Sequence, residues 1–253
     1  MKNTYELASE VAGLIKESKR LIVFSGAGIS TESGIPDFRG PGGIWQKFDP
    51  DDFTYQKFIN DAAARRSQWQ LFRQLATTVE PNPAHYAVAA LHRMGKLDCV
   101  VTQNIDNLHQ SAGVPEEKVL ELHGSMREMV CLSCGRRYST AQVIGRLETE
   151  EVPDCEQCRG ILKPDVVFFG EQLPQGIFNK AAERAGRCDL LIAIGSTLTV
   201  YPAAYIPEYA LDAGAKLVII NLSSTPLDKQ AAVLAQAKAG EFMTQVMQKI
   251  NGS

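Results

Sequence analysis

The stretch LIVFSGAGISTESGIPDFRG, residues 21–40, indicates the fold class of this chain. It opens with the apolar run 21–24, and the turn Gly26-Ala-Gly28 follows at once. An apolar run that meets two glycines is typical of a parallel strand that leads into a nucleotide-binding turn, because glycine lets the backbone approach phosphates. Taken alone, Gly-x-Gly fits any tight strand-to-helix turn equally well. The third glycine of the usual pattern arrives late, at Gly34.

Similar apolar runs recur along the chain, and helical patterns lie between several of them. The runs are rich in β-branched residues and do not alternate with polar ones, as expected of parallel strands covered on both faces. The runs are 21–24, 99–101, 119–122, 166–169, 190–194 and 217–220, and the helical patterns are 5–18, 83–94, 178–185 and 203–213. This order predicts an α/β fold with a doubly wound, mostly parallel, Rossmann-like sheet.

The composition is that of an ordinary globular chain. Its 253 residues are 45% hydrophobic and 22% charged, which suits one large domain or one domain with a small insert. The net charge of -3 does not favour direct nucleic-acid binding. No apolar run approaches the roughly 18 residues that span a membrane, and the first residues lack the features of a signal peptide. We therefore expect a cytoplasmic protein with no membrane partner.

Four of the six cysteines form two Cys-x-x-Cys pairs, Cys131 with Cys134 and Cys155 with Cys158. Twenty residues separate the pairs. Such spacing is typical of a zinc site, because each pair places two thiolates on one side of a tetrahedral ion. Since the protein would fill all four positions, we expect one structural zinc ion. The alternatives are unrelated thiols or a redox pair.

The cysteines lie in a polar segment that interrupts the strand and helix pattern. We expect residues 126–163 to form a small zinc-ribbon module, with part of the irregular region 36–80 packing beside it. Residues 1–125 and 164–253 then form the Rossmann-like domain.

Several short motifs, taken together, resemble those of one family. The stretch 26–40 resembles the signature of the sirtuins, the NAD-dependent protein deacylases, here of the bacterial and archaeal type with a single catalytic core. Further segments resemble sirtuin motifs in the same order. They are TQNID at 102–106, His123-Gly124, the four cysteines, VFFGE at 167–171, GSTL at 195–198, VYPA at 200–203, Asn221 and KAGE at 238–241. The resemblance runs from about residue 11 to the C-terminus.

The resemblance implies NAD as cofactor beside the structural zinc, and a nicotinamide-releasing reaction. The oxygen of an acyl-lysine would attack the ribose C1′, which gives deacylated lysine and O-acetyl-ADP-ribose. It also implies the residues that contact NAD. They are Gly26, Ala27, Gly28, Thr31, Asp37, Phe38, Arg39, Gln103, Asn104, Ile105, Asp106, His123, Gly195, Ser196, Thr197, Asn221, Leu222, Ser223 and Ala239.

Three of these residues are candidates for the chemistry. His123 follows the predicted strand 119–122, and an imidazole can accept a hydroxyl proton near neutral pH. The alternative is a packing histidine, with His109 as the rival base. Asp106 can accept from the nicotinamide carboxamide or cap a helix, and Asn104 can position ribose or water.

The acyl-lysine substrate is expected to bind as an extended strand that the protein reads through main-chain contacts. The residues expected around it are Phe38, Val167, Phe169, Gly170, Glu171 and Val200. The alternative for 166–169 is a core strand. The segment 67–73, SQWQLFR, lacks the Tyr-x-x-Arg pair of succinyl-preferring sirtuins, so we expect acetyl and other short neutral groups first.

Two alternatives to deacylation remain open from the sequence. One is ADP-ribosyl transfer to protein or plain NAD hydrolysis, which shares the cofactor. The other is a non-catalytic zinc-ribbon binding module. Ser223 stands where family members frequently carry glutamate, which puts one adenosine contact in doubt. The oligomeric state is not determined by the sequence, and a monomer is favoured.

Overall fold

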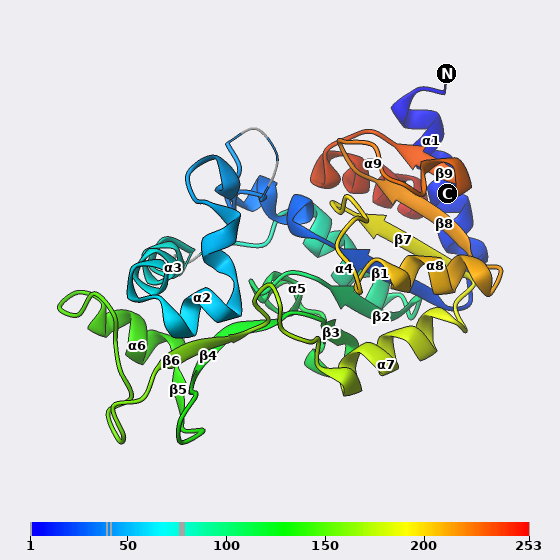
Figure 1. The fold of residues 1–253 in the computed structure, drawn as a ribbon. Coiled ribbons are helices and arrows are strands. Elements are labelled where there is room, and N and C mark those ends of the chain that lie inside the picture. The colour runs from blue at the N-terminus through cyan, green and yellow to red at the C-terminus, as the bar shows by residue number, and fades with distance from the viewer. Residues whose placement is uncertain (1, 39, 41, 76–78, 253) are drawn as a thin grey trace.

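The computed structural model describes residues 2–38, 40, 42–75 and 79–252 and contains two sheets (Figure 1). The larger sheet is parallel, with the strand order β3-β2-β1-β7-β8-β9. Its strands are β1 (Leu21–Ser25), β2 (Leu97–Thr102), β3 (Val119–Glu121), β7 (Leu190–Ile194), β8 (Lys216–Ile220) and β9 (Val233–Ala235). This order reverses between β1 and β7, which creates the switch point where open α/β sheets bind ligands.

Helices cover both faces of this sheet. On one face lie α1 (Thr4–Glu17), α4 (Pro83–Arg93) and α9 (Ala239–Asn251), and on the other lie α7 (Gln175–Ala185) and α8 (Tyr205–Asp212) (Figure 1). Alternate strand residues enter different cores. Val23 packs with the α1 side, whereas Ile22 and Phe24 pack with the α7 side. Burial on both faces explains why these strands show no polar alternation.

The second sheet is antiparallel, with the order β5-β4-β6. It contains β4 (Gly124–Cys131), β5 (Arg137–Ser139) and β6 (Leu162–Val166). Three helices accompany it, α2 (Tyr55–Asn60), α3 (Ala62–Leu75) and α6 (Thr140–Arg146) (Figure 1). Phe58 of α2 and Trp69 of α3 are fully buried in one core with Met129 of β4, so region 55–75 packs with this sheet.

Short elements connect these parts. The short helix α5 (Leu108–Ser111) follows β2. The 3₁₀ helices are η1 (Ala27–Ser33), η2 (Ile44–Gln46), η3 (Pro50–Phe53), η4 (Glu116–Lys118) and η5 (Asp228–Gln230). Among the helices that the structure describes, none is long and apolar enough to cross a bilayer.

The parallel sheet and its covering helices confirm the predicted fold class, but one predicted strand is wrong. The run 166–169 does not join the parallel sheet, because β6 ends at Val166 and pairs antiparallel with β4. Val166 and Phe168 instead pack into the core of the small sheet. An apolar run indicates that a segment is buried, but it does not indicate which sheet the segment joins. The strand β9 and the helix α9 were not predicted. The division at residues 126–163 stays a prediction, and the small sheet itself extends from residue 124 to 166.

Candidate active site

Two glycine turns meet at the switch point between β1 and β7. The Gly28 amide donates to the Gly195 carbonyl at 2.8 Å, and Gly26 donates to Ile194 at 3.1 Å. A Cβ on Gly28 would lie 2.8 Å from the Gly195 Cα, and one on Gly195 would lie 2.1 Å from the Ile29 nitrogen. The turn is therefore too tight for side chains and leaves bare backbone at the crevice, as a pyrophosphate site requires.

The late glycine marks the end of a 3₁₀ helix and not of a phosphate loop. The chain leaves Gly26 into η1, which ends at Gly34 with φ 92°. Glu32 of η1 accepts from the Gly240 amide at 2.7 Å, where α9 begins. Since η1 is short and tied to α9, the following residues turn away to form a loop and do not continue as a long helix.

A polar network joins η1 to the loop after β2. The Asn104 amide donates to the Gly26 carbonyl at 3.2 Å and to the Ser30 hydroxyl at 3.1 Å. Ser30 in turn donates to Asp106 at 2.7 Å, and the other Asp106 oxygen accepts from the Leu108 amide at 3.0 Å. Ser30 is 1% exposed and was not singled out from the sequence. The one feature of the sequence that could have pointed to Ser30 is its hydroxyl, two residues after Gly28 in the glycine turn.

His123 follows β3 and points its ring at the same loop. Its Nδ1 lies 2.9 Å from the Gln103 carbonyl oxygen. Because a carbonyl only accepts, Nδ1 carries the proton and Nε2 keeps a lone pair. Burial lowers the pKa of His123, and the Gln103 hydrogen bond opposes this in part. The imidazole is therefore neutral near pH 7 and equipped to accept a proton at Nε2.

The Gln103 side chain extends this arrangement to the loop after β7, because its amide donates to Ser196 at 2.9 Å. The rival base, His109, lies in the core. Its Nε2 is 2.9 Å from the Ser25 hydroxyl, its ring packs edge-on against His85, and it is 1% exposed. Burial lowers its pKa well below 6.5, so His109 has a packing role.

A cluster of aromatic side chains lies between the loop after η1 and the segment after β6. Phe38 and Phe169 are 41% and 47% exposed. Trp45 stands between them, with ring centroids 5.2 Å from Phe38 and 6.1 Å from Phe169. Trp45 was not singled out from the sequence. Asp37 accepts from the Gly40 amide at 2.7 Å, and Arg39 lies outside the described residues.

The segment 167–171 is fixed by main-chain and side-chain hydrogen bonds. Val167 donates to the His123 carbonyl at 2.9 Å, and the Phe169 carbonyl accepts from Tyr55 at 3.0 Å. The Glu171 carboxylate is turned inward, where it accepts from the Phe168 amide at 2.7 Å and pairs with Lys163 at 2.9 Å. Gly170 is exposed, and Val200 is half-buried in the loop before α8.

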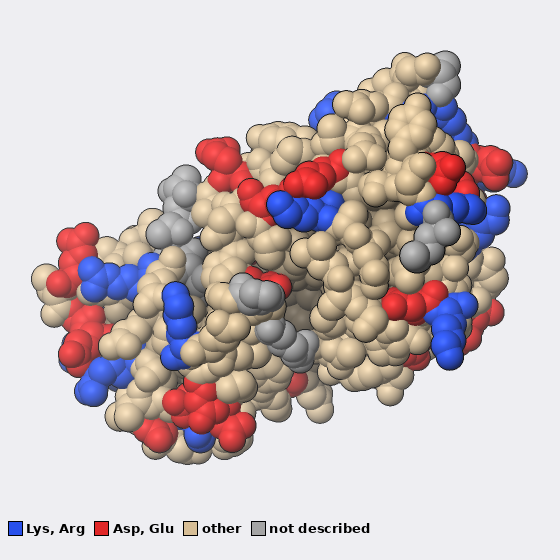
Figure 2. Space-filling view, turned by 90° about the horizontal axis from the view of Figure 1, so that it is seen from above, with Lys and Arg blue, Asp and Glu red and all other residues tan. Residues whose placement is uncertain are grey.

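The remaining predicted cofactor residues line the outer part of the same edge. Asn221 follows β8 and donates to the Ser223 carbonyl at 2.9 Å, while Leu222 is 66% exposed. Others are Ala27 and Thr31 in η1, Ile105 in the loop after β2, Thr197 in the loop after β7, and Ala239 at the start of α9. Seen from above, the surface is hollowed between the two parts of the molecule, and acidic and basic side chains are interspersed on this face (Figure 2).

The four cysteines gather at the end of β4 that lies away from His123. Their sulfur atoms all lie within 4.8 Å of one another. Cys131 is 3.5 Å from Cys158, and Cys134 is 3.7 Å from Cys155. Four thiolates around one zinc ion stand about 3.8 Å apart, from a zinc–sulfur distance of about 2.3 Å. The cluster thus fits one structural zinc. The Tyr138 hydroxyl lies 3.1 Å from the Cys155 sulfur.

Comparisons with known proteins agree with this geometry. The model of the Sir2 family matches residues 26–202. The NAD-dependent protein deacetylase 1 of Pyrobaculum aerophilum is 43% identical over 98% of this chain and 97% of its own. The fold of this chain is also similar to that of solved Sir2 structures. A Sir2 complex with a deacetylated p53 peptide and 3′-O-acetyl ADP ribose has a TM-score of 0.89 and 40% identity over 95% of this chain and 97% of that one.

A second solved structure, Sir2 with a p53 peptide and NAD+, has a TM-score of 0.87 and 39% identity over 96% of this chain and 98% of that one. These matches cover nearly the whole chain, including the glycine turns, the His123 loop and the cysteine cluster. The chain belongs to the Sir2 family.

Proposed function

We propose that this protein is an NAD-dependent protein-lysine deacetylase. The observation that carries the proposal is the state of His123, whose Nδ1 is committed to Gln103 and whose Nε2 is left as a base. It lies beside the loop that carries Asn104 and Asp106 and near the glycine turns that suit a dinucleotide. The relatives named as deacetylases, and the solved complexes with peptide and acetyl ADP ribose, support the same activity.

The glycine turns and the loop after β2 would hold NAD, which would supply a ribose C1′ that the acyl oxygen can attack as nicotinamide leaves. The chain's own residues do the rest. Asn104 and Asp106, held by Ser30, orient the ribose and the carboxamide. His123 accepts a ribose hydroxyl proton at Nε2. Phe38 and Trp45 exclude water from the carbon that would otherwise be hydrolysed.

The substrate is an acylated lysine in an extended peptide that lies along 167–170 and Val200. The exposed rings of Phe38 and Phe169 offer an apolar lining to the lysine stem and to a short acyl group. Since the segment 67–73 lacks the Tyr-x-x-Arg pair that would bind a carboxylate, acetyl should be preferred to succinyl. A cytoplasmic location and the lack of nucleic-acid binding stay predictions from the sequence, and a monomer stays the favoured state.

The test is a panel of acyl-lysine peptides incubated with NAD, with products identified by mass. Deacetylated peptide together with O-acetyl-ADP-ribose supports the proposal. Free ADP-ribose alone would indicate NAD hydrolysis, and a mass gain on protein would indicate ADP-ribosyl transfer. Succinyl peptides consumed as fast as acetyl peptides would contradict the predicted acyl preference.

A further inference from the structure

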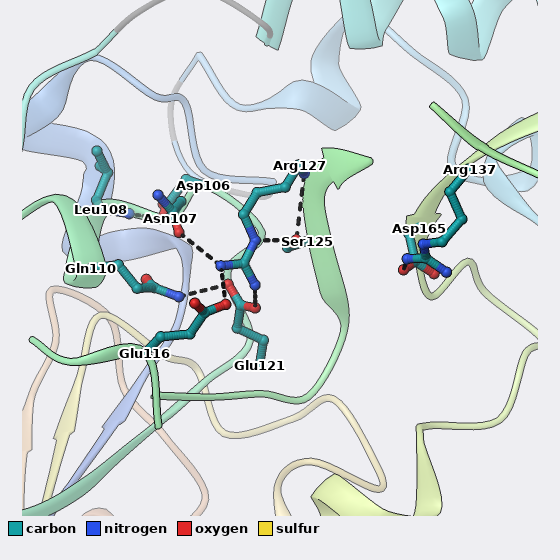
Figure 3. Close-up of polar contacts among 10 residues, drawn as sticks. All are labelled: Asp106, Asn107, Leu108, Gln110, Glu116, Glu121, Ser125, Arg127, Arg137 and Asp165. Carbon is teal, nitrogen blue, oxygen red and sulfur yellow. Dashed lines mark hydrogen bonds and ion pairs between the residues drawn. The ribbon is translucent and has the colours of Figure 1, made fainter. Parts of the chain in front are cut away.

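Arg127, four residues past His123 on β4, contacts groups from three other segments (Figure 3). Its guanidinium donates to Glu116 at 2.7 Å, Glu121 at 2.6 Å and the Asn107 side-chain oxygen at 3.5 Å. Its Nε also donates to the Ser125 hydroxyl at 3.0 Å. One planar group therefore links the small sheet to η4, to the end of β3 and to the loop after β2.

The bond from Arg127 to Glu121 is the one that bears on the candidate base. Glu121 is the last residue of β3, two residues before His123, and its side chain is only 11% exposed. Burial raises its pKa, while a hydrogen bond from Gln110 and the charge of Arg127 oppose that rise. A buried carboxylate is costly without a cation, so loss of Arg127 favours either protonation of Glu121 or a rearrangement of the end of β3. Either change removes the ion pair that fixes this segment.

The loop after β2 is held from the same side. Asn107 directly follows Asp106 and adopts a left-handed conformation, with φ 63°. Next to Arg127, the Met126 amide donates to the Ile105 carbonyl at 3.1 Å. Thus β4 holds both the segment that leads into His123 and the loop that contains Asn104 and Asp106.

We propose that Arg127 is a positioning residue, which fixes His123 relative to the 103–107 loop through its bonds to Glu121 and Asn107. The inference rests on the proposed function. Loss of Arg127 should impair proton transfer to His123 more than the earlier loss of nicotinamide. Glu121 lies two residues from His123, whereas Asn104 and Asp106 keep their bonds to Gly26 and Ser30 without Arg127.

The chain offers a matched control in Arg137 of β5, which Figure 3 shows on the side of the small sheet away from the loops. Arg137 also pairs with two carboxylates, Glu128 at 2.7 Å and Asp165. Its side chain is 48% exposed, and within the described part of the chain its guanidinium bonds only to these two acids. Its loss removes similar ion pairs without touching the β3 end.

The test compares Arg127→Ala with Arg137→Ala by two rates measured on the same zinc-loaded protein. Deacetylation requires His123, whereas exchange of labelled nicotinamide into NAD reports the preceding bond cleavage. We expect Arg127→Ala to lower the kcat for deacetylation about tenfold, since small misplacements of a reacting group have effects of this size. The ratio of exchange to deacetylation should rise several-fold in this variant only.

Arg127→Lys serves as the second variant, because it keeps one charge beside Glu121 and should restore part of the deacetylation rate. An unchanged ratio in Arg127→Ala, or an equal change in Arg137→Ala, would overturn the inference. If Arg127→Ala does not fold, a ratio in Arg127→Lys equal to that of the wild type overturns it as well. An inactive wild-type protein would instead refute the proposed function.

Discussion

Replacing Gly28 by alanine tests whether the contact between the two glycine turns builds the cofactor site. The added Cβ would lie 2.8 Å from the Gly195 Cα and 2.9 Å from its carbonyl oxygen, and both are backbone atoms. The turns must separate by about 0.6 Å to reach an ordinary contact of 3.4 Å. Gly195 cannot yield freely, because its amide donates to Ile220 at 2.9 Å.

The cost follows from two effects. Overpacking of this kind costs about 1–3 kcal/mol, and loss of the Gly28 to Gly195 hydrogen bond adds roughly 1 kcal/mol. A destabilisation of about 2–4 kcal/mol lowers the melting temperature of a chain of this size by roughly 5–15 °C. NAD should bind about tenfold more weakly or worse, because the amides that face the phosphates are displaced.

Gly13→Ala is the matched control. Gly13 lies inside α1, and a Cβ there meets nothing within 4 Å. Alanine in a helix interior is favoured over glycine by about 0.5–1 kcal/mol, so this variant should melt roughly 1–4 °C higher and bind NAD normally. Scanning calorimetry and titration calorimetry with NAD measure both effects. A Gly28→Ala protein that melts and binds NAD like the wild type would refute the reasoning.

Three further outcomes are expected. His123→Ala should lower the deacetylation rate at least about 100-fold with NAD binding retained. The rate of the wild-type protein should fall only below pH 6.5, since burial lowers the pKa of this base from 6.5. A decrease in rate that begins above pH 6.5 would contradict this. Elemental analysis should find one zinc ion per chain in the wild type and none in Cys155→Ser. The small sheet of this variant should unfold. A zinc-free variant that stays folded would argue against a structural role for the zinc. Burial lowers the pKa of His85 to about 4 and that of His109 well below 6.5, so their stabilising contribution is present above pH 6.5 and is lost as the pH falls toward 4. The melting temperature should therefore decline over this window, and a flat profile would be evidence against buried neutral rings.

Much of the fold was predictable because its strands carry a strong local pattern. Strands buried on both faces, such as Leu190–Ile194, read as unbroken apolar runs. The strand Val233–Ala235 was missed, although β3 is equally short and was predicted. Its surrounding run, AAVLA at 231–235, is mostly alanine, which is depleted in strands. The run 166–169 was assigned to the wrong sheet, because hydrophobicity does not specify a pairing partner.

The sequence by itself predicted the parallel sheet, the glycine turn and the four cysteines of a zinc site, because each of these rests on residue types in a local pattern. The candidate base, His123, came from the resemblance to sirtuin motifs, since its spacing alone fits a packing histidine as well. Only the tertiary structure decided that Ser30 holds Asn104 and Asp106, that Trp45 lies between Phe38 and Phe169, and that Glu171 turns inward to Lys163. Ser30 stands 74 residues from Asn104 and 76 from Asp106. Trp45 and Glu171 each have a partner nearby in the chain, but their side chains face in directions that spacing does not fix. Their roles depend on which segments the folded chain brings together, and the spacing of residues along the chain does not specify this.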